Sequence, residues 1–334
     1  MLNTANNNRV VVRLAGLAAI TGVCAVSQAQ LFSNGSANPL IPALALVNQT
    51  GNNTPAPNAS QWSEIGSSSA LLGNALAGIA CHADSTDATS GVRLADDFVV
   101  PAGQTWNLTS VQFYAYRPSG VSSPVTNATL RIWNGIPGGP GNVVVFGDTT
   151  TNRFSNADVT NAYRVFTTTV GPAITSPDTS RRIYNVNVAL NTTLQPGTYW
   201  LDWQFAGATA NTPIYVVPVT QVGVRTLAAW NARQFADGVW TPVLDTGKPD
   251  GAIDAAQDVA FILAGTAGVA CDSIDFNRNG TFPEDQDVID FFNVLAGEDC
   301  PYAGVCDIDF NNNQVFPEDQ DVIDFFTTLA GGDC

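Results

Sequence analysis

Residues 275–300 and 309–334 of this 334-residue chain are two copies of one unit. The copies match without a gap at a constant offset of 34 residues, and each ends in Leu-Ala-Gly followed closely by Cys. Duplication at a fixed period is typical of a module built from repeated supersecondary units. The repeat therefore separates a small C-terminal module, residues 267–334, from the rest of the chain.

Each copy opens with the residue spacing of a calcium-binding loop. In the first copy Asp275, Asn277 and Asn279 stand at positions 1, 3 and 5, and Gly280 at position 6 permits a sharp turn. Alternate residues of such a loop point inward, so their oxygens can surround one hard cation. In the second copy position 6 is Gln314, which lacks the conformational freedom of glycine, so we expect weaker calcium binding there.

The last ligand of each loop is ambiguous in the sequence. Position 12 normally carries a carboxylate, but a glutamine stands there in both copies and an aspartate follows it. Either the loop is one residue longer or the last ligand is an amide. The candidate calcium ligands are Asp275, Asn277, Asn279, Thr281, Gln286 and Asp287 in the first copy, and Asp309, Asn311, Asn313, Val315, Gln320 and Asp321 in the second.

One helix is predicted after each loop. Pro283 and the carboxylates that follow it are typical of the first turn of a helix. In the first copy Val288, Phe292 and Leu295 then recur at helical spacing, and Gly297 ends the helix. Two loop-helix units are predicted, with no helix leading into either loop.

The pair resembles the cysteine-containing, GC-type dockerin repeats at the C termini of secreted proteins of planctomycete-like bacteria. Loop, helix, repeat length and terminal Cys all coincide over about 64 residues. The resemblance implies a small all-α module of the dockerin or EF-hand type. It also implies calcium as cofactor and attachment to a cohesin-like or other cell-surface anchoring protein.

The acidity of the chain is concentrated in this module. Residues 266–334 hold 15 of the 29 acidic residues and one basic residue, Arg278, which gives this segment a formal charge of −14. Bound cations would offset the repulsion among these charges. The alternative is an acidic, disulfide-clamped helical pair that needs no metal.

Four cysteines frame the repeats. A helix of about 13 residues is ~20 Å long, whereas a disulfide joins Cα atoms within about 7 Å. If the repeats pack antiparallel about a pseudo-twofold axis, the expected disulfides are Cys271–Cys334 and Cys300–Cys306. Pairing within each repeat is the alternative, if the loops fold back along their helices.

The N-terminal residues 1–29 have the pattern of a secretory signal peptide. Arg9 and Arg13 precede an apolar stretch, and Ser27 and Ala29 are the small residues expected before a cleavage site. About 13 apolar residues are too few for a membrane span, which needs ~20. We therefore expect a secreted or cell-surface protein without a membrane span, with residues 30–90 as a loosely structured lead-in.

Residues 91–266 are predicted to form a jelly-roll-like β-sandwich, so the fold class is mainly β. Short apolar or alternating runs are separated by Gly, Pro and Asn, as in antiparallel sheets. The runs Ala95-Asp96-Asp97-Phe98, Arg131-Ile132-Trp133-Asn134-Gly135 and Pro196-Gly197-Thr198-Tyr199-Trp200-Leu201-Asp202 resemble those of a family of secreted bacterial β domains that mostly lack an assigned function. The expected strands are 97–100, 109–116, 129–133, 143–147, 161–168, 181–190, 197–205, 214–217, 228–233 and 260–264.

The composition argues against most catalytic devices. The chain has one His (His82) and one Lys (Lys248), so a His-based triad, a histidine zinc site and a lysine Schiff base have few candidates. Cys81 is the odd one of the five cysteines after the signal peptide, so a free or intermolecularly paired thiol is expected there. A net charge of −16 argues against nucleic acid as a partner.

These observations predict a secreted, non-catalytic β protein held on a partner by its calcium-binding module. The rival interpretation is an extracellular carbohydrate-binding protein, or a carbohydrate-active enzyme, attached through the same module, with polysaccharide as partner. It rests on the seven Trp residues and on one strand face that carries Trp200, Asp202 and Gln204. The competing explanation is that these Trp residues pack in the hydrophobic core or at its edge.

Overall fold

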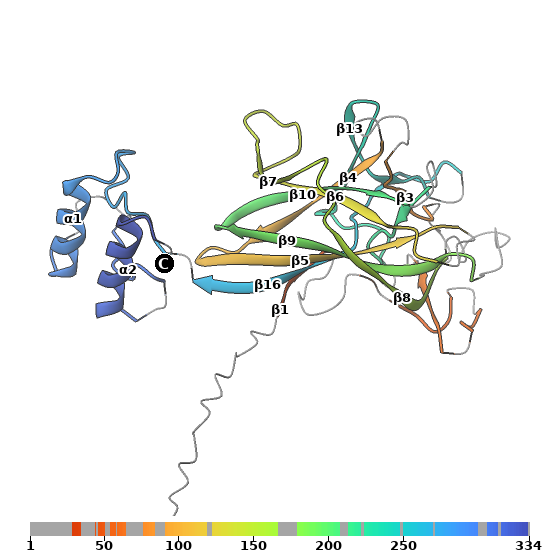
Figure 1. Ribbon diagram of the computed structural model, residues 1–334, viewed down its shortest axis with the longest axis horizontal. Helices are drawn as coiled ribbons and strands as arrows, with labels where there is room; N and C mark the ends of the chain where they lie inside the picture. Colours follow the sequence, from red (N-terminus) through yellow and green to blue (C-terminus); the bar gives the residue numbers. More distant parts are fainter. Residues whose placement is uncertain are drawn as a thin grey trace, which may run out of the picture.

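The computed structural model describes residues 29–34, 44, 46–50, 54–57, 59–64, 76–83, 91–118, 122–165, 179–207, 213–221, 224–247, 250–269, 271–299, 306–312 and 315–332. Two large sheets form the main body, and two helices lie beyond the end of the last long strand (Figure 1). The expected signal peptide lies outside the described residues except for Ala29, which begins the first strand.

The first sheet has eight strands. Its main path runs β1 (Ala29–Ser33), β16 (Phe261–Val269), β5 (Gln104–Tyr116), β9 (Arg182–Leu194), β8 (Phe154–Val165) and β2 (Gln61–Glu64), and the short strands β3 (Ile79–Ala80) and β11 (Tyr215–Val216) extend β5 on the side. The β2–β8 pair is parallel and the other pairs are antiparallel.

The second sheet has six antiparallel strands. Their order is β13 (Val239–Pro242), β12 (Arg233–Ala236), β4 (Arg93–Val100), β10 (Gly197–Ala206), β6 (Asn127–Trp133) and β7 (Val144–Asp148). A separate small ladder joins β14 (Leu244–Asp245) to β15 (Ala255–Ala256), and the helices are α1 (Asp285–Leu295) and α2 (Asp319–Leu329).

The main hydrophobic core contains side chains from both sheets. Successive residues of a strand point to opposite faces, so Leu201, Trp203 and Phe205 of β10 share one face. All three are fully buried, and the Trp203 ring stacks on Phe113 of β5 with 4.5 Å between centroids. Phe261 of β16 packs edge-on against Trp203. The prediction of a mainly β fold is confirmed, and the packing agrees with a β-sandwich, while the jelly-roll connectivity stays a prediction.

Two parts of the sequence interpretation need correction. The segment 30–90, expected as a loose lead-in, contributes most of β1 and all of β2 and β3 to the eight-stranded sheet. The segment expected as a strand at 228–233 is instead a turn that leads into β12. The Trp230 N–H donates to the Leu227 carbonyl to close this turn, and only Arg233 of the segment pairs with β4. Strand β16 runs to Val269, three residues past the expected domain boundary.

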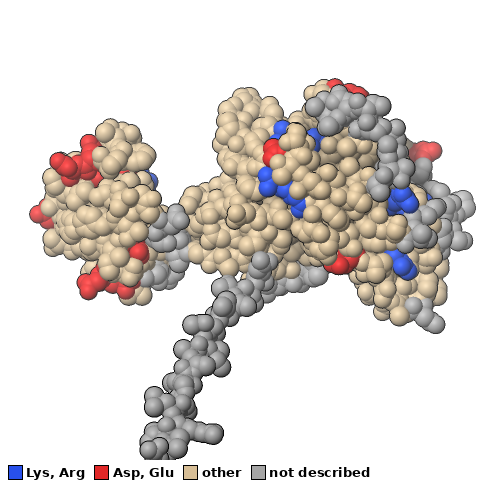
Figure 2. All heavy atoms as spheres, viewed as in Figure 1, with Lys and Arg blue, Asp and Glu red and all other residues tan. Residues whose placement is uncertain are grey.

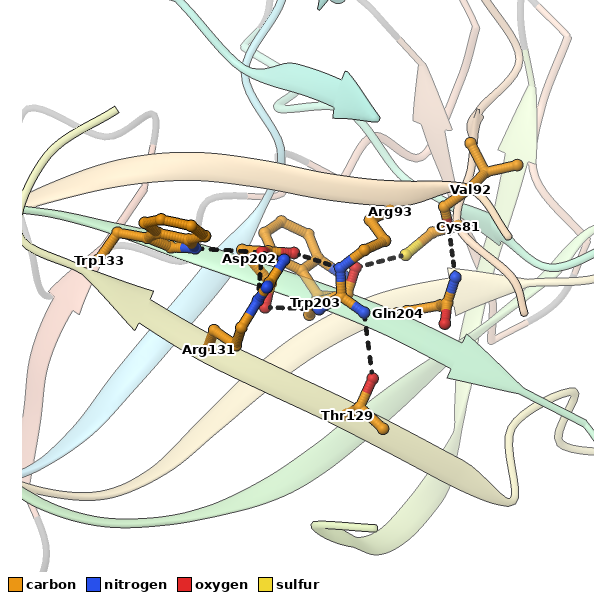
Figure 3. Close-up of polar contacts among 9 residues, drawn as sticks. All are labelled: Cys81, Val92, Arg93, Thr129, Arg131, Trp133, Asp202, Trp203 and Gln204. Carbon is orange, nitrogen blue, oxygen red and sulfur yellow. Dashed lines mark hydrogen bonds and ion pairs between the residues drawn. The ribbon is translucent and has the colours of Figure 1, made fainter. Parts of the chain in front are cut away.

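The outer face of β10 is also buried, and it holds an ion network instead of an open sugar platform (Figure 3). Asp202 is 0% exposed, and its Oδ1 accepts the Arg93 Nε–H at 2.6 Å. Its Oδ2 accepts hydrogen bonds from Arg131 Nε at 2.8 Å and from the Trp133 indole at 3.1 Å. Trp200 and Gln204 beside it are each 4% exposed.

This network ties three adjacent strands together. Arg93 comes from β4, Asp202 from β10, and Arg131 from β6. Arg93 also donates to the Thr129 hydroxyl and to the Asp202 carbonyl, so each of its three guanidinium nitrogens makes a hydrogen bond. Desolvation makes a buried ion pair a weak net stabiliser, but loss of one partner leaves the other charge buried and uncompensated.

We expect Asp202→Ala to lower the free energy of unfolding by about 3–5 kcal/mol, because Arg93 would remain buried without its counter-charge. Denaturant unfolding followed by far-UV circular dichroism measures this change. Asp254→Ala, at an exposed position, is the control and should shift the value by less than about 0.5 kcal/mol. Equal stability of the two variants would contradict the role of Asp202.

Candidate functional site

Four phenylalanines form the core of the C-terminal module. Phe291 of α1 stacks on Phe325 of α2, with ring centroids 4.2 Å apart and planes 7° from parallel. Phe276 packs edge-on against Phe291, and Phe310 packs in the same way against Phe325. Phe291 and Phe325 are equivalent residues, and the contact of Phe276 with Phe291 in the first copy recurs as that of Phe310 with Phe325 in the second, so the packing agrees with a pseudo-twofold relation between the repeats.

The first loop is wound around the carboxylate of Asp275. Its Oδ1 accepts the main-chain N–H of Asn279 at 3.0 Å, and its Oδ2 accepts that of Gly280 at 2.9 Å. Arg278 has a φ of 55° and Gly280 a φ of 82°, so two residues in the left-handed region turn the chain back. The amide oxygens of Asn277 and Asn279 accept main-chain N–H groups of the same loop.

The structure distinguishes the two candidates for the last ligand. Gln286 is exposed, and its amide donates to Asp290 Oδ1 at 2.7 Å, away from the loop. Asp287 is 0% exposed, and its Oδ1 accepts the main-chain N–H of Asn277 at 3.3 Å. Its other oxygen, Oδ2, is buried and has no hydrogen-bond partner among the described residues. The geometry therefore favours a loop one residue longer, closed by Asp287.

The second loop repeats this arrangement where it is described. Asp321 is 0% exposed, its Oδ2 accepts the Glu318 N–H at 3.1 Å, and its buried Oδ1 has no hydrogen-bond partner in the part of the chain that is described. Burial raises the pKa of the Asp321 carboxyl. Asp309 and Asn311 are each 6% exposed. Gln320 donates to Asp324, as Gln286 does to Asp290. Asn313 and Gln314 lie outside the described residues.

The oxygen ligands that the loops offer are of the chemical types that a hard cation binds. The first loop offers carboxylate oxygens from Asp275 and Asp287 and amide oxygens from Asn277 and Asn279, which are the ligand types that calcium takes. Thr281 and Val315 have exposed side chains, so only their carbonyl oxygens could take part. Among the described residues, no three His, Cys, Asp or Glu side chains gather as a metal cluster, so the amide oxygens are essential to this donor set.

The helices begin later and bury a different face than expected. Each starts at an aspartate, Asp285 or Asp319, so the prolines precede the first turn instead of lying within it. We expected Phe292 on the buried face, but it is 39% exposed and its equivalent Phe326 is 43% exposed. The fully buried rings are those of Phe291 and Phe325, because these two residues form the stack between the helices.

Two module cysteines are in disulfides. Cys271 and Cys306 are both disulfide-bonded and pack against the phenylalanine core. Cysteines 300 and 334 lie outside the described part of the chain. The pairs Cys271–Cys334 and Cys300–Cys306 therefore stay a prediction.

Cys81 is a free thiol in the core of the sandwich. It is 0% exposed, and its Sγ lies 3.4 Å from the Trp203 carbonyl oxygen, to which it donates. Burial raises its pKa to about 12, so the reactive thiolate is strongly disfavoured at neutral pH. Of the two alternatives expected for Cys81, the free thiol is confirmed, and its buried Sγ is not accessible to a second chain.

Comparison with protein-family models gives no match, and no curated protein matches the chain. In the part of the chain that the structure describes, no helix is both long and apolar enough to cross a membrane.

We expect Cys81 to resist alkylation by iodoacetamide at pH 8 in the folded protein and to react fully in guanidinium chloride. Burial keeps the reagent away from the thiol, and a pKa of about 12 keeps the thiol protonated at pH 8. Mass spectrometry of the non-reduced protein counts the adducts. Rapid labelling under native conditions would show that the core around Cys81 opens readily.

Proposed function

We propose that this is a secreted, non-catalytic protein whose C-terminal module binds calcium and attaches the β body to a cell-surface or extracellular protein of the cohesin type. The observation that carries the calcium proposal is the pair of buried carboxylates, Asp287 and Asp321, each with one oxygen that no described residue contacts by a hydrogen bond. A buried, unsatisfied carboxylate oxygen is costly, and a cation within the loop would satisfy it.

Charge supports the same proposal. The segment 266–334 carries a formal charge of −14, and Figure 2 shows acidic side chains on the surface of the helical module. A bound calcium ion in each loop would reduce the repulsion among these groups. Because two of the side-chain ligands in each loop are neutral amides, we expect weak binding of the extracellular kind, with a Kd of about 10⁻⁴ to 10⁻³ M.

We expect calorimetric titration of the mature protein with calcium to show two sites, the first loop being the tighter. Position 6 of the first loop is Gly280, with a φ of 82°, and a glutamine in that conformation, as the second copy has at position 6, would cost roughly 1–2 kcal/mol. Asp287→Asn should weaken the first site at least about tenfold, since a carboxylate ligand becomes a neutral amide. Gln286→Ala, at the exposed neighbour, should leave both sites unchanged. No heat of binding, or equal loss in both variants, would reject the assignment.

The attachment surface is expected on the exposed helix faces. Ile289 and Phe292 of α1 and Ile323 and Phe326 of α2 are each 39–54% exposed, and the two phenylalanine rings lie 5.9 Å apart. An open groove of about 750 Å³ adjoins them, lined by Val322, Ile323, Phe326, Thr327, Ala330, Gly331 and Gly332. Exposed apolar surface rimmed by charge is typical of protein interfaces. Phe291 and Phe325, one position earlier in each helix, are buried and cannot contact a partner.

We expect the double variant Phe292→Ala, Phe326→Ala to release the protein from the surface of the producing cells into the medium, as deletion of residues 266–334 should. Both rings are partly exposed, so the module should remain folded. Ile253→Ala, an exposed apolar residue of the β body, is the control and should stay attached. Immunoblots of cell and medium fractions measure the distribution. Full retention of the double variant would exclude this surface.

A further inference from the structure

The C-terminal module follows the β body almost without a linker (Figure 1). Strand β16 ends at Val269, and Cys271 is disulfide-bonded and packs against the phenylalanine core of the module. A single residue, at position 270, separates these two points in the sequence. The contacts of the joint, residues 271–272, therefore decide how the module is oriented on the sheet.

The second loop of the module holds this joint through two hydrogen bonds. The Asp272 N–H donates to the Phe310 carbonyl at 2.8 Å. The Asp272 carboxylate accepts a hydrogen bond from the Asn312 side-chain amide at 3.1 Å. A hydrogen bond to a carboxylate is stronger than one between neutral groups. The chain that leaves β16 is thus bound at once to the second copy of the repeat, although the first copy follows it in the sequence.

Asn312 also approaches the β body itself. Gly103 lies in the turn between β4 and β5, with a φ of 72°. A Cβ atom added at Gly103 would lie 3.9 Å from the Cβ of Asn312. The side chain of Asn312 therefore lies close to both the sandwich turn and the joint, so the second loop is the part of the module that meets the β body.

A difference between the two copies accounts for the use of the second loop. Arg278 and Asn312 are equivalent at the 34-residue offset, and both have a φ of 55°. The main chain therefore repeats, whereas the side chains differ. Arg278 is an exposed cation, and Asn312 is a short amide that donates to Asp272.

The first copy also has one extra residue, Ser273, between its Cys-Asp pair and its loop. The Ser273 hydroxyl accepts the Asp275 N–H at 3.1 Å, and in the second copy Asp307 makes the equivalent bond to the Asp309 N–H at 3.0 Å. Because Ser273 takes this role at the start of the first loop, the Asp272 carboxylate is available to Asn312.

The candidate calcium ligands of the second loop alternate with the residues that hold the joint. Asp309 and Asn311 are candidate ligands, and Phe310 and Asn312 contact Asp272. The Asn312 N–H donates to the Asp309 carbonyl at 2.9 Å, which closes the turn between them. A cation held by the ligand side chains would fix this turn, and groups that are already fixed lose less entropy when they form hydrogen bonds.

We propose that calcium in the second loop fixes the orientation of the module on the β body through Asp272, and that the first loop has no part in this joint. The inference rests on the proposed calcium sites and gives the second site a role of its own. With the joint fixed, the exposed helix faces point in one direction from the β body. Without calcium in the second loop, the joint opens and the module reorients.

The test is hydrogen–deuterium exchange of the mature full-length protein with calcium or with a chelator, read by mass spectrometry in peptides within residues 266–276. Exchange of an amide reports the opening of its hydrogen bond. The Asp272 amide should exchange at least about tenfold more slowly in calcium. In calcium, Asp272→Ala should speed exchange at this position about tenfold, after correction for intrinsic rates, and leave peptides from α1 and α2 unchanged.

Two ligand variants form a matched pair, because Asp321 and Asp287 are the equivalent buried carboxylates of the two loops. At millimolar calcium, Asp321→Asn should speed exchange at the joint about tenfold, and Asp287→Asn should stay within about twofold of the wild type. Equal effects of the two variants would overturn the proposal, as would wild-type exchange in Asp272→Ala. Loss of protection in α1 and α2 as large as that at the joint would also overturn it, since the module would then be unfolding as a whole.

Calorimetry on the same samples separates this inference from the calcium proposal. Calcium binding at both sites, with exchange at the joint the same in calcium and in chelator, would overturn the joint alone. Absence of any calcium binding would overturn the joint and the calcium proposal together.

Discussion

The two faces of β10 hold the β body together by different means. Its inner face contributes Leu201, Trp203 and Phe205 to the core, where the aromatic rings of β5 and β16 pack against Trp203. Its outer face contributes Asp202, which joins β4 and β6 through two arginines. Because one central strand serves both purposes, the position of the outer arginines is fixed by the same packing that builds the core.

The C-terminal module is held by a much smaller core. Burial of four phenylalanines about a pseudo-twofold axis is the main apolar contact between its two helices. That arrangement turns Phe292 and Phe326 outward and brings Asp287 and Asp321 inward against the loops. The positions of the candidate metal ligands and of the candidate docking surface are therefore both set by the same helix packing.

The distribution of charge separates the roles of the two parts. Most of the net charge of −16 comes from the last 69 residues, as the acidic surface of the helical module in Figure 2 indicates. The sandwich carries most of the basic residues, and three of them lie on one sheet face: Arg93, Arg131 and Arg233. The two parts therefore differ in charge density: the helical module is strongly acidic, whereas residues 30–265 hold 14 acidic and 10 basic residues.

The sequence by itself determined the mainly β class, most of the strand positions and the loop-helix repeat. These features follow from local patterns: alternation with period 2, helical spacing after Pro283, and a duplicated run of Asp and Asn. It also limited the last calcium ligand to two neighbours, Gln286 and Asp287. Local patterns could not choose between these two residues. Neighbouring residues of a helix point in different directions, and the packing of the helix decides which of them faces the loop.

Tertiary structure decided the remaining points. Stacking of Phe291 on Phe325 set the rotation of both helices, which buried Asp287 and exposed Phe292. Pairing of β1 with β16, and of β2 with β8, brought a polar, low-complexity segment into the sheet, since main-chain hydrogen bonds do not require a hydrophobic sequence. The pairing of Arg131 with Asp202 depends on strand order, and strand order arises from contacts between residues far apart in the sequence, here 71 positions.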